Sequence, residues 1–211
     1  MLNNKTKKII LLVSGSFFIL FGLFAMFFSV YNGTPEWILW ACYIGMIIIG
    51  IGILIKDGEL IASQLNILTI PLLLWTFDFI YTLFTGRNIL GMAEYFFDRV
   101  DLVPKVISLE HLFLLPIGFF ALYLIGLKER DSWKISYIQL TAVFLIMKLF
   151  RITDSNVNCI SYPCWNFPIF QPYFIEWFLI IFTAVALTSF MINKLFLTKT
   201  TNPHYQLLEQ G

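Results

Sequence analysis

The sequence predicts an all-α protein: a bundle of six transmembrane helices with both termini in the cytoplasm and an outward-facing polar cavity. Three observations lead to this fold class. Hydrophobic residues make up 59% of the 211 residues and charged residues only 13%, against about 25% charged in a soluble domain. Six apolar stretches are long enough, or nearly so, to cross a bilayer. Lysine and arginine are also distributed unequally between the loops on the two sides.

Each predicted span needs about 20 apolar residues to cross the hydrocarbon core. The first stretch follows three lysines, as a signal peptide would, but it is longer than the apolar part of a signal peptide and is interpreted as a retained span. The fifth is the weakest, because Lys148 and Arg151 lie near its end. Pro71 and Pro116 fall inside the third and fourth, where proline usually kinks a helix. The spans of this single domain are 9–30, 37–55, 60–84, 106–126, 135–152 and 174–197, with a polar tail at 198–211.

The orientation follows from the basic residues of the short loops, because cytoplasmic loops are enriched in lysine and arginine. Nine lie on one predicted side and four on the other, which places both termini inside and requires an even number of spans. The chain is therefore expected to be a multi-pass protein of the inner (plasma) membrane. The inner set is Lys5, Lys7, Lys8, Lys56, Lys128, Arg130, Lys134, Lys194 and Lys199, and the outer set is Arg87, Arg99, Lys105 and Arg151.

Strongly polar residues gather in one layer near the outer ends of the predicted helices. Asp78 lies six residues from the outer end of the third span, and Ser108, Glu110 and His111 occupy the first two turns of the fourth. An ionisable group inside a bilayer costs roughly 2.5–3.5 kcal/mol, so it is retained when paired or functional. The functional interpretation is an outward-facing pocket. The alternative is that these groups reach water or form structural pairs.

His111 is the best single candidate for catalysis, because imidazole can act as base, acid or ligand near neutral pH. Ser108 lies three residues earlier on the same helix face, and Asp78 or Glu110 could orient the ring. A serine–histidine pair with an acid suits acyl transfer or hydrolysis. The alternative is a histidine bonded to a carboxylate or carbonyl that holds two helices together.

Further polar residues of the outer loops are candidates for ligand binding. The run Asp154-x-Asn156-x-Asn158 resembles the start of a calcium loop, but the next position is Cys159 instead of glycine and the twelfth is Trp165 instead of glutamate. The same residues also suit turns. Because no zinc spacing occurs either, no metal site is expected. The candidate ligand-binding residues are Asp98, Asp101, Lys148, Arg151, Asp154, Asn156 and Asn158.

The three cysteines have different predicted roles. Cys159 and Cys164 lie five residues apart in an outer loop, where an extracytoplasmic compartment permits a disulfide. We expect them to be joined, with two free thiols as the alternative. Cys42 lies in an apolar run and is interpreted as a small core hydrophobe.

Four short motifs resemble a group of uncharacterised bacterial integral membrane proteins. They are Met92-Ala-Glu-Tyr-Phe-Phe-Asp98, Asp101-Leu-Val-Pro104, Ser108-Leu-Glu-His111 and Thr153-Asp-Ser-Asn156-Val-Asn158. The resemblance covers about residues 60–197 and implies a bacterial membrane protein without an established activity. In that group tryptophan commonly follows Asn-x-Asn, where this chain has Cys159. The cysteine pair is therefore expected to be a local elaboration.

Three classes of function remain open. The first is an enzyme at the outer leaflet that acts on a lipid or small ligand, with His111 as base. The second is a transporter or binding protein that uses the same groups, although the sequence shows little charge in the inner halves of the helices. The third is a non-catalytic assembly partner. The net charge of +1 gives no sign of nucleic-acid binding, membrane lipid is the expected partner, and the sequence indicates no particular cofactor.

Overall fold

The computed structural model describes residues 3–98, 101–152, 154–164 and 171–197. These residues confirm the all-α class, because they contain no strand beyond an isolated bridge between Leu127 and Leu197. The predicted tail 198–211 and the motif residue Thr153 lie outside the described part of the chain. The helices are α1 (Asn4–Tyr31), η1 (Pro35–Leu39), α2 (Ala41–Ile55), α3 (Gly58–Thr85), α4 (Glu94–Asp98), α5 (Leu102–Ser108), α6 (Glu110–Ile125), α7 (Ser132–Leu149), η2 (Val157–Cys159) and α8 (Tyr173–Phe196).

Four predicted spans each coincide with one helix, whereas 37–55 covers part of η1 and α2, and 106–126 covers the end of α5 and α6. Four of the helical segments are long and apolar enough to cross a membrane. They are α1, α3, the α5–α6 pair and α8. Helix α2 is apolar but has only 15 residues, because the turn η1 occupies the first part of the predicted second span. Helix α7 is 18 residues long and includes the polar residues Gln139 and Lys148. The described chain thus has the helices of a membrane protein.

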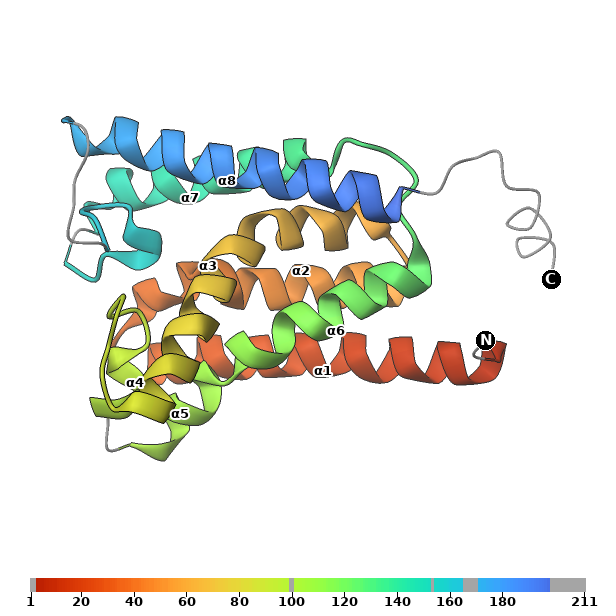
Figure 1. The fold of residues 1–211 in the computed structure, drawn as a ribbon, viewed down its shortest axis with the longest axis horizontal. Coiled ribbons are helices and arrows are strands. Elements are labelled where there is room, and N and C mark those ends of the chain that lie inside the picture. Colours follow the sequence, from red (N-terminus) through yellow and green to blue (C-terminus); the bar gives the residue numbers. More distant parts are fainter. Residues whose placement is uncertain (1–2, 99–100, 153, 165–170, 198–211) are drawn as a thin grey trace.

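The connections gather at two opposite ends of the bundle (Figure 1). We call one the terminal end, because α1 begins there and α8 ends there. At this end the backbone N–H of Leu127 donates to the Phe196 carbonyl over 3.3 Å, and that of Glu129 donates to Glu59 Oε1 over 2.8 Å. The other is the loop end, which holds η1, α4, α5 and η2 (Figure 1).

Helices α1 and α2 approach each other closely through two glycines. A Cβ atom on Gly50 would lie 2.8 Å from the Gly15 carbonyl oxygen, and one on Gly15 would lie 2.8 Å from the Leu54 side chain. Larger residues at either position would push the helices apart. Small residues are a common means of helix packing in membranes, where lipid is as apolar as leucine.

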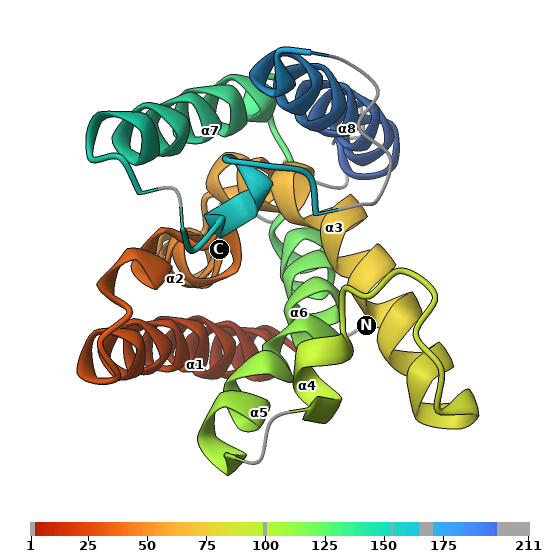
Figure 2. The same ribbon diagram turned by 90° about the vertical axis from the view of Figure 1, so that its left-hand side faces the viewer.

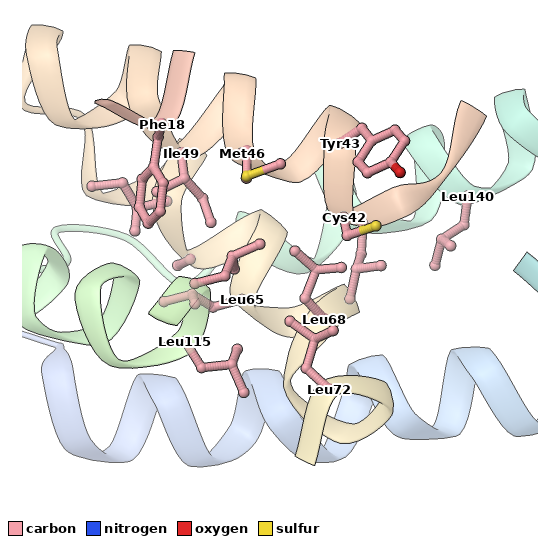
Figure 3. Close-up of a cluster of buried hydrophobic side chains, with 14 of the residues drawn as sticks. Phe18, Cys42, Tyr43, Met46, Ile49, Leu65, Leu68, Leu72, Leu115 and Leu140 are labelled. Carbon is pink, nitrogen blue, oxygen red and sulfur yellow. The ribbon is translucent and has the colours of Figure 1, made fainter. Parts of the chain in front are cut away.

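The main hydrophobic core is formed by α1, α2, α3 and α6 and continues to α7 and α8 (Figure 3). Phe18, Met46, Ile49 and Leu65 are fully buried within it. Many other large apolar side chains are exposed on the outside of the bundle, such as Phe84, which is 82% exposed. A surface of this kind suits contact with lipid.

The loop-end half of α3 leans away from α7 and α8 towards α4 and α5 (Figure 2). Trp75 and Phe79 on this half form a second, smaller core with Ala93. Side chains of α4 and of the α5–α6 junction pack against it, namely Tyr95, Phe96, Phe97, Leu109 and Leu112. This aromatic cluster positions the polar residues described next.

Candidate functional site

The candidate site forms where α5 gives way to α6. Leu109 separates the two helices, and Glu110 and His111 occupy the first turn of α6. The backbone of Leu109 still bonds in both directions, from its N–H to Lys105 and from its carbonyl to the Leu112 N–H. This short interruption places Glu110 inside the bundle and His111 at its edge, with exposed side-chain fractions of 0% and 15%.

Glu110 is the least satisfied polar group of the site. Neither of its carboxylate oxygens accepts a hydrogen bond from an N–H or O–H group of the described residues. Its Oε1 lies 3.9 Å from Nδ1 of His111. Cys42 is the second residue of α2. Its thiol, the Glu110 carboxylate and the His111 ring form a group whose ligand atoms all lie within 4.8 Å of one another. A thiol is only a weak donor, so the carboxylate retains acceptor capacity.

The ring of His111 is held by two contacts. Its Nδ1 lies 2.7 Å from the Ser108 carbonyl oxygen. Because a carbonyl only accepts, Nδ1 carries the proton in a neutral ring and the Nε2 lone pair remains available to a proton or a ligand. The Trp75 indole stacks on the imidazole, with centroids 4.5 Å apart and an interplanar angle of 28°. These contacts fix both the tautomer and the orientation of His111.

Tyr95 covers this stack from α4. Its hydroxyl approaches the side chains of Ser108 and Trp75. Burial raises the pKa of Tyr95 to about 12, so the hydroxyl keeps its proton at neutral pH and can donate it in a hydrogen bond. The aromatic cluster thus presents one more polar atom to the site.

Asp78 does not pair with His111, which corrects the expectation from depth along the helices. Its Oδ1 accepts from the backbone N–H groups of Ile89 and Leu90 over 3.2 and 2.8 Å, and its Oδ2 accepts from that of Ala93 over 2.9 Å. The carboxylate therefore organises the segment between α3 and α4. Helices α3 and α6 are neighbours, but the contact to His111 comes from Trp75, one turn before Asp78.

Ser108 contacts His111 through its backbone carbonyl and not through its hydroxyl. Its hydroxyl donates to the Pro104 carbonyl over 2.8 Å, within its own helix, while its backbone carbonyl contacts His111. The three-residue spacing did predict that the two residues meet. The pattern could not show which oxygen of Ser108 faces the ring.

The two asparagines of the Asn-x-Asn motif hold the loop end together. Asn158 donates to the Leu39 carbonyl over 2.8 Å and accepts from the Ala41 N–H over 2.9 Å, so it joins η1 to α2. Asn156 accepts from the N–H groups of Ser161 and Tyr162 at 3.0 and 3.1 Å. Both asparagines have positive φ, 41° and 54°, which asparagine tolerates better than most residues. Their contacts are structural.

The predicted disulfide and the predicted free cysteine are both present in the structure. Cys159 and Cys164 are joined by a disulfide, and Cys42 is a free, buried cysteine. Asn156 also contacts this loop, with its Nδ2 3.5 Å from the Cys164 sulfur. The surroundings of Cys42 are the unexpected finding, because a residue in an apolar run meets a carboxylate.

The other predicted ligand-binding residues lie apart from Glu110 and His111. Asp98 ends α4 and Asp101 precedes α5, and both are exposed. Arg151 and Asp154 are exposed residues that follow α7. Lys148 lies over the Phe144 ring, with its Nζ 5.6 Å from the centroid. It also lines a hollow of about 490 Å³ with Phe144, Ser161, Tyr173 and Phe174.

Sequence reasoning missed a second polar layer, which lies between α3, α7 and α8. Gln64 Nε2 donates to Gln139 Oε1 over 2.7 Å, and Asn66 Nδ2 approaches the Ser132 hydroxyl at 3.2 Å. The Thr188 hydroxyl donates to the Asn66 carbonyl over 2.8 Å. This amide layer is uncharged, so a search for charged residues overlooks it. The run Ser63-Gln64-Leu65-Asn66 inside an apolar span was the available signal.

Comparison of the chain with known protein families, with curated proteins and with solved structures found no match. Function is therefore inferred from the geometry of the site.

Proposed function

We propose that the chain crosses the plasma membrane of a bacterial cell six times, with both termini in the cytoplasm. Two observations support this topology. Eight of the nine basic residues of the predicted inner set lie in helix ends or connections at the terminal end, and the ninth, Lys199, lies outside the described residues. Cytoplasmic loops carry such an excess. Helices α1 and α8 begin and end there respectively (Figure 1), as an even number of crossings requires. The loop end then faces outward, in a compartment that permits the disulfide.

We further propose that Cys42, Glu110 and His111 form a site for a lipid or small ligand at the outer leaflet. The observation that carries this proposal is the burial of Glu110 without an N–H or O–H donor among the described residues for either oxygen. An unmet buried acceptor costs roughly 1–3 kcal/mol, and more when charged. A purely structural residue would be expected to have a partner. A carboxylate kept in this state suits a bound proton, cation or ligand.

The chemistry that fits the site best is hydrolysis of an acyl or related ester. The Nε2 lone pair of His111 can take a proton from an attacking water, and the Ser108 carbonyl holds Nδ1–H in the matching tautomer. Glu110 lies close enough to favour the imidazolium that forms. Water is the better nucleophile here, because the Ser108 hydroxyl donates to Pro104.

The test compares membranes from cells that express wild-type protein with those that express His111→Gln or Glu110→Gln. Mass spectrometry of lipids and lipid-linked species should show a substrate that accumulates to the same extent with either variant. Glu176→Gln is the matched control, because Glu176 is also a fully buried glutamate in the first turn of a loop-end helix. Identical lipid profiles for wild type and both site variants would contradict the hydrolytic proposal.

A second candidate function, transport of a small polar ligand, is favoured by the amide layer. Transport requires polar groups deeper in the bundle than the Glu110 site, and Gln64 and Asn66 provide buried amides on α3. The outer ligand site would then be an entry point. Uptake into proteoliposomes that depends on both Glu110 and Gln64 would favour transport over hydrolysis.

A further inference from the structure

We propose that Cys42, Glu110 and His111 bind a divalent transition-metal ion of the zinc class. This inference rests on the ligand site of the proposed function, since it names the species that the site holds. With the ion bound, His111 Nε2 is a ligand, and activation of water passes from the imidazole to the ion. Thiolate, carboxylate and imidazole are the three protein ligand types that zinc uses. Their ligand atoms lie within 4.8 Å of one another, a small contraction away from a shared tetrahedral centre with metal–ligand distances of about 2.0–2.3 Å.

The charge balance of the site favours a divalent ion over the empty state. A thiolate and a carboxylate carry two negative charges, a neutral imidazole carries none, and a divalent cation cancels the sum. The complex is therefore neutral, which suits a membrane interior where an uncompensated charge is costly. Cys42 and Glu110 must be deprotonated to bind the ion, so the apparent affinity should rise with pH.

The ligand set also decides which metals fit. A thiolate is a soft ligand, which disfavours magnesium and calcium because these ions select oxygen. The His111 side chain is partly exposed while Glu110 is fully buried, so of these two ligands the imidazole lies nearer the surface. The Ser108 carbonyl on Nδ1 is the kind of outer contact that orients a metal-bound histidine. Three protein ligands leave a fourth position for water or a substrate atom.

Sequence spacing could not reveal this site. The zinc patterns that are read from sequence place ligands a few residues apart, whereas Cys42 lies on α2 and the other two ligands begin α6. The aromatic stack and the α5–α6 interruption bring them together. A thiol in an apolar helix then becomes a ligand because of the carboxylate that faces it.

The experiment uses full-length protein, purified in detergent, stripped with chelator and titrated with Zn²⁺ or Co²⁺. We expect one ion per chain, and the cobalt form should show a thiolate-to-metal charge-transfer band and intense visible bands of a tetrahedral site. Cys42→Ser should abolish the charge-transfer band. Glu110→Gln and His111→Gln should each weaken binding by more than the roughly tenfold effect of losing an outer contact to a ligand, because each removes a direct ligand. Glu176→Gln should bind as wild type does.

Alkylation of Cys42 provides a second readout that does not depend on catalysis. In unfolded, chelator-treated protein the thiol should react fully, and in folded protein Zn²⁺ should slow its alkylation relative to the metal-free form. Cys159 and Cys164 do not compete, since they form the disulfide. Loss of metal binding in a variant counts only if its melting temperature shows that it is folded. If folded wild type binds less than a tenth of an equivalent and Zn²⁺ leaves alkylation unchanged, the metal site is overturned.

The two proposals fail separately. Absence of metal together with altered lipid profiles in His111→Gln cells would overturn the metal site and leave the hydrolytic function. Stoichiometric metal with unchanged lipid profiles would overturn the hydrolytic function and support a metal-binding role.

Discussion

Trp75 of α3 and His111 of α6 stack on each other, and this contact links the two helices at the candidate site. The ring centroids are 4.5 Å apart, and Trp75 in turn stacks on Phe79 at 5.0 Å. The imidazole is therefore clamped between an indole on one side and the Ser108 carbonyl at its edge. An orientation fixed in this way is what a base or metal ligand needs.

Replacement of Trp75 by leucine should uncouple His111 from α3. Aromatic pairs contribute about 0.5–1.5 kcal/mol beyond the area they bury, so the double variant Trp75→Leu/His111→Gln should be less destabilised than the sum of the single variants by about that amount. Thermal unfolding in detergent, run as a double-mutant cycle, measures this coupling. Phe84→Leu is the control, because Phe84 is on the same helix and 82% exposed. Additive effects of Trp75→Leu and His111→Gln would show that the stack has no energetic role.

Asp78 should be important for stability through the segment that it organises. Asp78→Ala leaves the N–H groups of Ile89, Leu90 and Ala93 without their acceptor, and hydrogen bonds to a charged group contribute about 1.5–3 kcal/mol each. We expect a loss of about 3 kcal/mol or more and increased protease cleavage near residues 86–93. Asp78→Asn retains one oxygen acceptor and should lose less.

The control for this prediction is Asp98→Ala, since Asp98 is exposed at the end of α4. It should melt within about 0.5 kcal/mol of wild type. If Asp78→Ala were equally harmless, the three backbone contacts would be of no consequence for the fold.

Asn158 should be irreplaceable for two separable reasons. Its amide joins Leu39 to Ala41, and its φ of 54° favours asparagine or glycine. Asn158→Gly relieves the backbone but removes both side-chain hydrogen bonds, so it should cost about 1–3 kcal/mol. Asn158→Ala adds the strain of a positive φ and should cost about 1 kcal/mol more. Equal melting temperatures for the glycine and alanine variants would rule out a contribution from the backbone conformation.

The all-α class could be predicted from the sequence because burial in lipid requires long apolar stretches. Four of the six stretches coincide with one helix, and the second and fourth are each divided between two. The sequence also predicted that Ser108 and His111 meet, since a three-residue spacing fixes one face of a helix. It did not predict the partner of Asp78. The spacing of residues in the sequence gives the depth of a side chain along a helix. It does not give the direction of that side chain around the helix axis, because this direction depends on how the helices pack.

Two further differences have the same physical origin. Cys42 looks like a core hydrophobe along α2, and only the interruption at Leu109 brings Glu110 to it. Gln64 and Asn66 are uncharged, so their cost in an apolar span is lower than that of a charged residue and they attract less attention in a sequence. Both cases show a polar group whose role is set by a residue on another helix.

The six-span topology predicts which connections face the cytoplasm. Reporter fusions after Lys128 and after Lys56 should report the cytoplasm, because both connections lie at the terminal end. A fusion within 156–164 should report the outside. A cytoplasmic signal from this last fusion would refute the topology, and it would also place the disulfide in a reducing compartment.

The amide layer should stabilise the packing of α3 against α7. Gln64 is fully buried, and its Nε2 donates to both Gln139 Oε1 and the Ser63 hydroxyl, at 2.7 and 3.1 Å. Side-chain hydrogen bonds between helices in a membrane contribute about 0.6 kcal/mol on average and up to about 1.7. Gln139→Leu should therefore lower the free energy of unfolding more in the wild-type background than in the Gln64→Leu background. In the wild-type background the substitution leaves the Gln64 amide without the Gln139 acceptor, whereas in the Gln64→Leu background that amide is already absent. Unfolding measured in mixed micelles tests this inequality. If all three variants are equally stable, the Gln64–Gln139 contact does not hold the helices together. A role of Gln64 in ligand passage is then the better explanation for an amide at this depth.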